Sequence, residues 1–169
     1  MRRRAWQGDG RLPSVAMAAL RAEIVRFLDD TRGRRNWAHK GLQVAIAHLG
    51  VDEARWTPPA GHSVWEQINH IAYWKRYIVA RVQGRRTPAR QAWPPGGRTA
   101  AELRRAVGNL EALHRDLHTA VLAVDQDRLT AGPRYSVAQL LLGEAAHESY
   151  HIGQIFLTRR QYRRQRSGR

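Results

Sequence analysis

Apolar residues recur along this chain at the spacing of helices. In the segment 100–123, residues placed at 100° intervals collect the large apolar side chains on one face, as in an amphipathic helix. These are Leu103, Leu110, Leu113, Leu117, Val121 and Val124. No stretch of useful length alternates apolar and polar residues as a half-buried strand does. The pattern predicts an all-α fold.

Three expected helices begin with the same signal, a hydroxyl residue followed three positions later by Glu or Gln. Such a pair forms a capping box, in which two side chains satisfy backbone amides at the helix start. The signal occurs at Ser63, Thr99 and Ser136. Together with a break at Gly33 and the apolar pattern around it, these signals predict helices over 15–30, 37–49, 63–82, 100–123 and 137–159.

The connection from Gly84 to Thr99 is rich in Pro and Gly and too long for a tight turn. About fifteen extended residues reach roughly 50 Å, whereas a helix of about twenty residues is roughly 30 Å long. The helices on either side of the connection can therefore run in the same direction. A helical bundle with one long crossover is expected.

The formal charge is +15, and more than half of the excess lies in residues 1–11 and 159–169. Basic ends bind nucleic acid nonspecifically. A general preference for arginine explains the same excess, because the chain has 27 Arg and only two Lys. We divide the chain into a flexible basic extension (1–14), a helical domain (15–160) and a basic tail (161–169).

Composition excludes several classes of site. The chain has no cysteine, which rules out disulfides, a Cys nucleophile and thiolate zinc sites. No apolar run approaches the length of a membrane span. The arginines after Met1 are not followed by the apolar segment of a signal peptide. A cytoplasmic protein that does not enter the membrane is expected.

The strongest chemical signal is His147-Glu148-Ser149-Tyr150-His151, within the longest run free of Lys and Arg, 135–158. Histidines four apart project from one face of a helix and can bind one metal ion. The same face carries Glu144, Tyr150 and Gln154, without the arginines of solvated faces. The pattern favours a polar, metal-binding pocket inside the bundle.

Two alternatives to this reading are disfavoured. His114 and His118 have the same spacing but lie among charged residues, so we interpret them as surface or boundary residues. The stretch from His147 also matches the HExxH signature of zincin proteases. Those enzymes need a third ligand downstream, and no Asp, Glu or His follows His151. The third ligand must lie upstream, and His70, with Trp74 on its helix, is the best candidate.

These stretches resemble the DinB/YfiT-like family. Ser63-Val-Trp-Glu-Gln-Ile-Asn-His70-Ile-Ala-Tyr-Trp-Lys75 is similar to its second-helix motif, and Ala146-His147-Glu-Ser-Tyr-His151 to its fourth. Residues 49–61 are similar to its first linker. The resemblance implies an up-down-down-up four-helix bundle with a long crossover between helices 2 and 3. It also implies a divalent metal bound by His70, His147 and His151.

Three imidazoles without a carboxylate leave coordination positions open for water or substrate, as in catalytic zinc sites. Zinc, nickel and iron(II) all suit this donor set. Glu148 is a candidate catalytic proton acceptor, or equally a carboxylate at the pocket rim. Glu144 is a candidate to support the ligands from behind, and Tyr150, Gln154 and Trp74 are candidates to shape the pocket.

The resemblance further implies a metalloenzyme acting on a small molecule. Its members include hydrolase-like proteins and transferases that use low-molecular-weight thiols such as bacillithiol or mycothiol. A non-catalytic, stress-associated metal-binding protein and nucleic-acid binding through the basic ends are the alternatives. The resemblance and the six Trp residues also favour a homodimer.

Overall fold

The computed structural model describes residues 14–34, 40–91, 93–132 and 134–168. Within these ranges the chain forms helices and their connections, and no strand occurs there. The helices are α1 (Ser14–Arg32), α2 (Leu42–Ala45), α3 (Val51–Arg55), α4 (Val64–Val82), α5 (Ala100–Leu122), α6 (Gln126–Leu129) and α7 (Val137–Ser167). The all-α expectation is confirmed, and none of these helices is long and apolar enough to cross a membrane.

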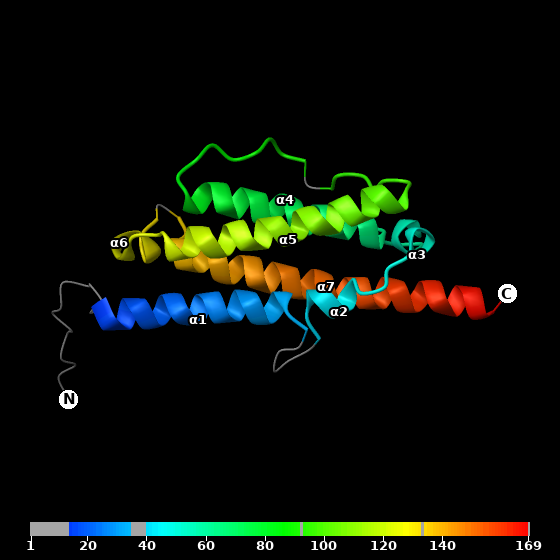
Figure 1. Ribbon diagram of the computed structural model, residues 1–169, viewed down its shortest axis with the longest axis horizontal. Coiled ribbons are helices and arrows are strands. Elements are labelled where there is room, and N and C mark those ends of the chain that lie inside the picture. Colours follow the sequence, from blue (N-terminus) through cyan, green and yellow to red (C-terminus); the bar gives the residue numbers. More distant parts are fainter. Residues whose placement is uncertain (1–13, 35–39, 92, 133, 169) are drawn as a thin grey trace, which may run out of the picture.

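The long helices α1, α4, α5 and α7 lie side by side, and the short ones sit in the connections between them (Figure 1). Helix α4 packs against α5 and α7, and α1 packs against α7 and α5. The connection between α4 and α5 runs back along the helices, so both helices start at the same end (Figure 1).

Buried apolar side chains form two clusters at different levels of the helices. One contains Ile78 and Val82 of α4 with Leu141 and Ala145 of α7. The other takes the start of α4, including Ile68 and Ile71, and the later part of α7, including Ile152 and Ile155. On α7, His147 and His151 fall between the two clusters, after Ala145 and before Ile152, whereas His70 lies within the α4 stretch of the second cluster.

The three capping boxes are confirmed: Ser63, Thr99 and Ser136 each accept a hydrogen bond from the backbone amide three residues on. The Glu or Gln at that third position returns a bond to the cap amide. The predicted helices over 15–30, 63–82 and 100–123 agree with α1, α4 and α5 to within two residues. Local signals were sufficient at these helices.

The predicted helix over 37–49 is wrong. Residues 35–39 lie outside the described ranges, and only the single turn α2 is helical in the remainder. Gly41 packs so closely on Gly33 that a Cβ there would lie 2.1 Å from the Gly33 carbonyl oxygen. His48 then takes a left-handed φ of 54°. The chain turns at both positions, and a separate helix, α3, follows where a linker was expected.

The predicted end of the last helix at residue 159 is also wrong, because α7 continues through the expected basic tail to Ser167. The buried Arg159 side chain donates from Nε to Glu53 Oε1 at 2.9 Å and from Nη1 to the Ala47 carbonyl at 3.0 Å. Tyr162 packs on Trp56 with ring centroids 6.0 Å apart. These contacts hold the added turns against α3 and the segment after α2.

Candidate metal centre

Three histidine side chains converge where α4 faces α7. The Nε2 atom of His147 lies 3.0 Å from Nε2 of His70 and 3.1 Å from Nε2 of His151. These atoms all lie within 4.8 Å of one another, which is compatible with coordination of one metal ion. The structure thus brings together the three residues that the sequence singled out. His114 and His118 lie elsewhere, where both approach Asp29.

The environment keeps the imidazoles of α7 neutral. His70 and His151 are buried, and the side chain of His147 is 27% exposed. Burial, reinforced by the neighbouring histidines, lowers the pKa of His147 to about 3 and that of His151 to about 4. Neutral imidazoles keep a lone pair for a metal ion at pH 7. The donor set therefore fits a divalent transition metal.

Gln154 orients one of the three histidines. Nδ1 of His151 lies 2.9 Å from Oε1 of Gln154, one helical turn away on α7. Because an amide oxygen only accepts, the proton lies on Nδ1 and the lone pair on Nε2, which faces the other histidines. His147 lacks such a bond, since its Nδ1 is 3.9 Å from the nearest Glu144 oxygen.

Aromatic rings cover the histidine cluster. Trp93, in the connection between α4 and α5, stacks on His70 at 3.8 Å between centroids and on His62 at 3.5 Å. Trp74 meets His147 and His70 edge-on. Sequence reasoning named Trp74 but missed Trp93, because no local pattern shows where a long connection returns to the bundle.

Residues 93–97, here called the strap, carry Trp93 and are held against α4. The side-chain amide of Asn69 donates to the Pro95 carbonyl at 2.7 Å. A Cβ on Gly97 would lie 2.7 Å from the Trp65 ring, so only glycine fits this approach. The strap is thus bound to α4 at the level of the metal centre.

A buried cluster of three charged side chains lies beside the histidines. Lys75 of α4 contacts Glu148, and its Nζ lies 3.4 Å from Oε1 of Glu144. All three side chains are at most 2% exposed. Burial lowers the pKa of Lys75, but the charges of Glu148 and Glu144 outweigh it and hold that pKa above its usual value. Burial raises the pKa of Glu144 to about 7 against the opposing charge of Lys75.

This cluster corrects one expectation for Glu148. The expectation that Glu148 is a carboxylate at the pocket rim is wrong, since Glu148 is fully buried and faces Lys75. Lys75 was missed, although one signal existed: it is one of only two lysines and lies within the apolar helix α4. A cation at such a position requires a buried partner.

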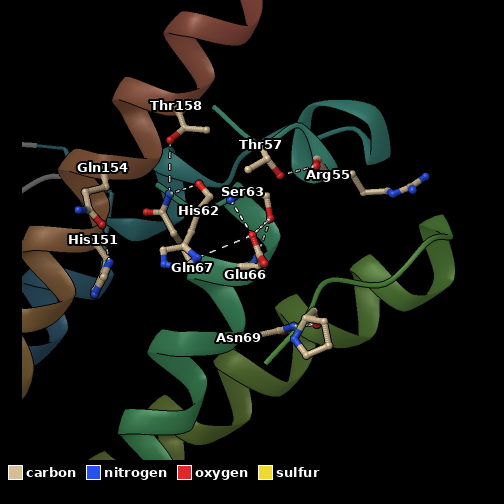
Figure 2. A network of polar contacts seen from close by, with 11 residues as sticks. Arg55, Thr57, His62, Ser63, Glu66, Gln67, Asn69, His151, Gln154 and Thr158 are labelled. Atoms are coloured by element: carbon tan, nitrogen blue, oxygen red, sulfur yellow. Dashed lines mark hydrogen bonds and ion pairs between the residues drawn. The ribbon is translucent and has the colours of Figure 1, made fainter. Parts of the chain in front are cut away.

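A polar cavity of about 310 Å³ opens on the His151 side of the histidine cluster. Figure 2 shows several of its residues. The Gln67 amide nitrogen donates to the His62 carbonyl at 3.1 Å and lies 3.4 Å from the Thr158 hydroxyl. Gln154 and Tyr150 also line this cavity. Tyr150 is 63% exposed, with its ring 5.1 Å from that of His151.

A second cavity, of about 320 Å³, opens on the His147 side. Its lining is mostly apolar and includes Trp74, Ile78, Tyr135 and Leu140. Glu144 lies at its inner wall, where the carboxylate pairs with Lys75. The histidine cluster therefore has a cavity on each side.

The model of the DinB superfamily matches residues 35–155, which include all three histidines and more than half of the chain. The chain belongs to the DinB superfamily. No curated protein and no solved structure matches it. The resemblance drawn from the α4 and α7 motifs is thereby confirmed for this DinB protein.

Proposed function

We propose that this DinB protein binds one divalent transition-metal ion through His70, His147 and His151 and uses it in a reaction on a small molecule. The observation that carries the proposal is the convergence of three Nε2 atoms in a cluster without a carboxylate. Zinc, nickel(II) and iron(II) all suit such imidazole donors. We further propose that the four long helices form an up-down-down-up bundle around the site.

When bound, a divalent ion held by three protein ligands would take a further ligand and lower the pKa of a coordinated thiol or water. Thiol-dependent transfer suits this chemistry. The thiol releases its proton to solvent, and its sulfur forms a bond to an electrophilic carbon of the acceptor. The leaving group departs from that carbon with the bonding electron pair. Water in place of the thiol gives the hydrolase-like alternative.

The surrounding residues support this role without entering the reaction. Gln154 fixes the ring of His151, and Trp93 and Trp74 restrict water around the histidines. The sequence suggested Glu148 as the proton acceptor. We propose instead that Glu148 acts as the counter-charge of Lys75, since its carboxylate contacts that ammonium group.

A metal-binding protein without catalysis shares the same donor set, and the covering of His70 by Trp93 favours it as a second candidate. Nucleic-acid binding is a third candidate, favoured by one observation. Lys40, Arg160, Arg163 and Arg164 line a groove of about 910 Å³ beside the end of α7. Phosphate binding there would weaken steeply with salt.

We also propose a homodimer. Helix α7 exposes three large apolar side chains: Leu142, Tyr150 and Leu157 are 43%, 63% and 56% exposed. Large apolar side chains in a row on an exposed helix face are typical of protein interfaces. Tyr150 also lines the polar cavity, so this face adjoins the proposed site.

Metal analysis of the purified protein tests the proposal. About one ion per chain is expected from three converging imidazoles. His147→Ala should abolish binding, whereas the matched variant His114→Ala should retain it, because His114 faces Asp29. Equal losses in the two variants would contradict the assignment of the site. A thiol should then change the visible spectrum of the cobalt-substituted protein through sulfur-to-metal charge transfer.

A further inference from the structure

The two cavities beside the histidine cluster differ in chemical character. His151 lines the polar cavity and His147 lines the apolar one. Each is at the small end of the range for ligand pockets, roughly 300–1,000 Å³. Each therefore suits a fragment or a small ligand, and two ligands can approach the same three histidines from different sides.

The polar cavity offers hydrogen bonds but no charged side chain. Its lining contains no Asp, Glu, Lys or Arg, in a chain with 29 Lys and Arg. The buried Oε1 atom of Gln67 has no hydrogen-bond partner. The orientation of this amide is fixed, because its nitrogen must face the His62 carbonyl. A buried acceptor of this kind favours a ligand that brings an O–H or N–H donor.

The apolar cavity has mostly apolar walls, although Gln139 and the Glu144 carboxylate also line it. Trp74, Ile78, Tyr135 and Leu140 form much of its wall. Gly143 also lines it, and a Cβ added there would meet no atom within 4 Å. This open space suits an apolar or aromatic group of a ligand, placed next to the ring of His147.

We propose that the metal centre joins two ligand subsites. The polar cavity binds the uncharged, hydroxyl- or amide-rich part of the thiol, and the apolar cavity binds an apolar or aromatic group of the acceptor. This assignment rests on the proposed thiol-dependent function, because it places the thiol in one cavity and the acceptor in the other. It favours a hydroxylated, neutral thiol over one that carries several carboxylates.

Two thiols and one fluorophore test the subsites in the cobalt-substituted protein. For the polar cavity, 1-thio-β-D-glucose and mercaptosuccinate are compared by charge-transfer absorption. The neutral sugar thiol should bind at least tenfold more tightly, although the positive protein attracts the dianion. Gln67→Met should weaken sugar-thiol binding about tenfold, roughly the loss of one hydrogen bond at the upper end of its usual range. Gln165→Met, on the exposed end of α7, should leave it unchanged.

For the apolar cavity, the neutral fluorophore N-phenyl-1-naphthylamine reports binding by its increase in emission. Gly143→Leu should weaken binding at least tenfold by filling the cavity. Gly153→Leu is the matched control, because Gly153 also lies on α7 with open space at its Cβ but lines neither cavity. Saturating sugar thiol should not displace the fluorophore.

Three results would overturn the proposal: mutual displacement of the probes, equal effects of the two leucine variants, or tighter binding of mercaptosuccinate. The proposed function fails separately. If no thiol changes the cobalt spectrum, thiol chemistry and the polar subsite are rejected together. If binding of the fluorophore still depends on Gly143, the result supports the apolar subsite alone.

Discussion

Lys75→Met should destabilise the protein severely, because it removes the only cation described between two buried carboxylates. Lys75 has no exposed surface, and the side chains of Glu144 and Glu148 are 2% and 1% exposed. Methionine matches the length of the lysine stem, so the change removes the charge and leaves little empty volume. The two carboxylates must then stay charged without a partner or take up protons.

Removing one partner of a buried ion pair typically costs about 3–5 kcal/mol. We expect a loss in this range at pH 7, a large share of the roughly 5–15 kcal/mol that stabilises a domain. The loss should shrink as the pH falls from 7 towards 5. Burial already raises the pKa of Glu144 to about 7, above the unfolded value of 4.5, and removing Lys75 raises it further. A folded state that binds more protons than the unfolded state gains stability at lower pH.

Urea unfolding of the metal-free protein, followed by circular dichroism in the presence of EDTA, measures these changes. Lys75→Met combined with Glu144→Gln and Glu148→Gln should recover most of the loss, because three neutral side chains replace the charged cluster. A loss below about 1 kcal/mol for the single variant, the size expected of an exposed ion pair, would refute the reasoning. A loss that the glutamine changes fail to reverse would contradict it equally.

Three further outcomes are expected. As the pH falls from 6.5 towards 3, the metal-free protein should lose more stability than the His147→Gln variant. Folding holds the pKa of His147 at about 3, so the folded state excludes a proton that the unfolded chain binds. Identical pH profiles of thermal unfolding for the two proteins would contradict this. Gln154→Leu should weaken metal binding about 10–100-fold in chelator competition by releasing His151, whereas unchanged affinity would remove Gln154 from this role. Light scattering should give a dimer mass that Leu157→Arg reduces to a monomer, and a monomer mass for the unaltered protein would reject the dimer.

Local sequence signals predicted the helices that begin at capping boxes, because those signals act within a few residues. They failed at residues 37–49 and at the end of α7, where distant partners decide. Arg159 extends the last helix by pairing with Glu53, more than a hundred residues earlier in the chain. Such a contact has no counterpart in the local pattern.

The candidate site, too, was predictable only where local sequence signals decide the structure. Helical spacing predicted that His147 and His151 lie together, and the absence of a downstream ligand directed the search upstream to His70. Spacing did not show which neighbours of His147 face the ligands. Glu148 is about 100° further around α7, and that rotation turns its carboxylate to the buried Lys75. Trp93 reaches His70 only through the path of a long connection.

The strap of residues 93–97 should make one part of the connection between α4 and α5 intolerant of length changes. Surface loops usually accept insertions and deletions because they carry few contacts. Residues 85–91 are mostly exposed, so this part of the connection should accept length changes. Between Trp93 and Gly97, a residue added or lost would break the match between the strap and its contacts with Asn69 and Trp65, and Trp93 would no longer stack on His70. Related chains that differ in loop length are therefore expected to differ before Trp93, while the register of the strap stays constant.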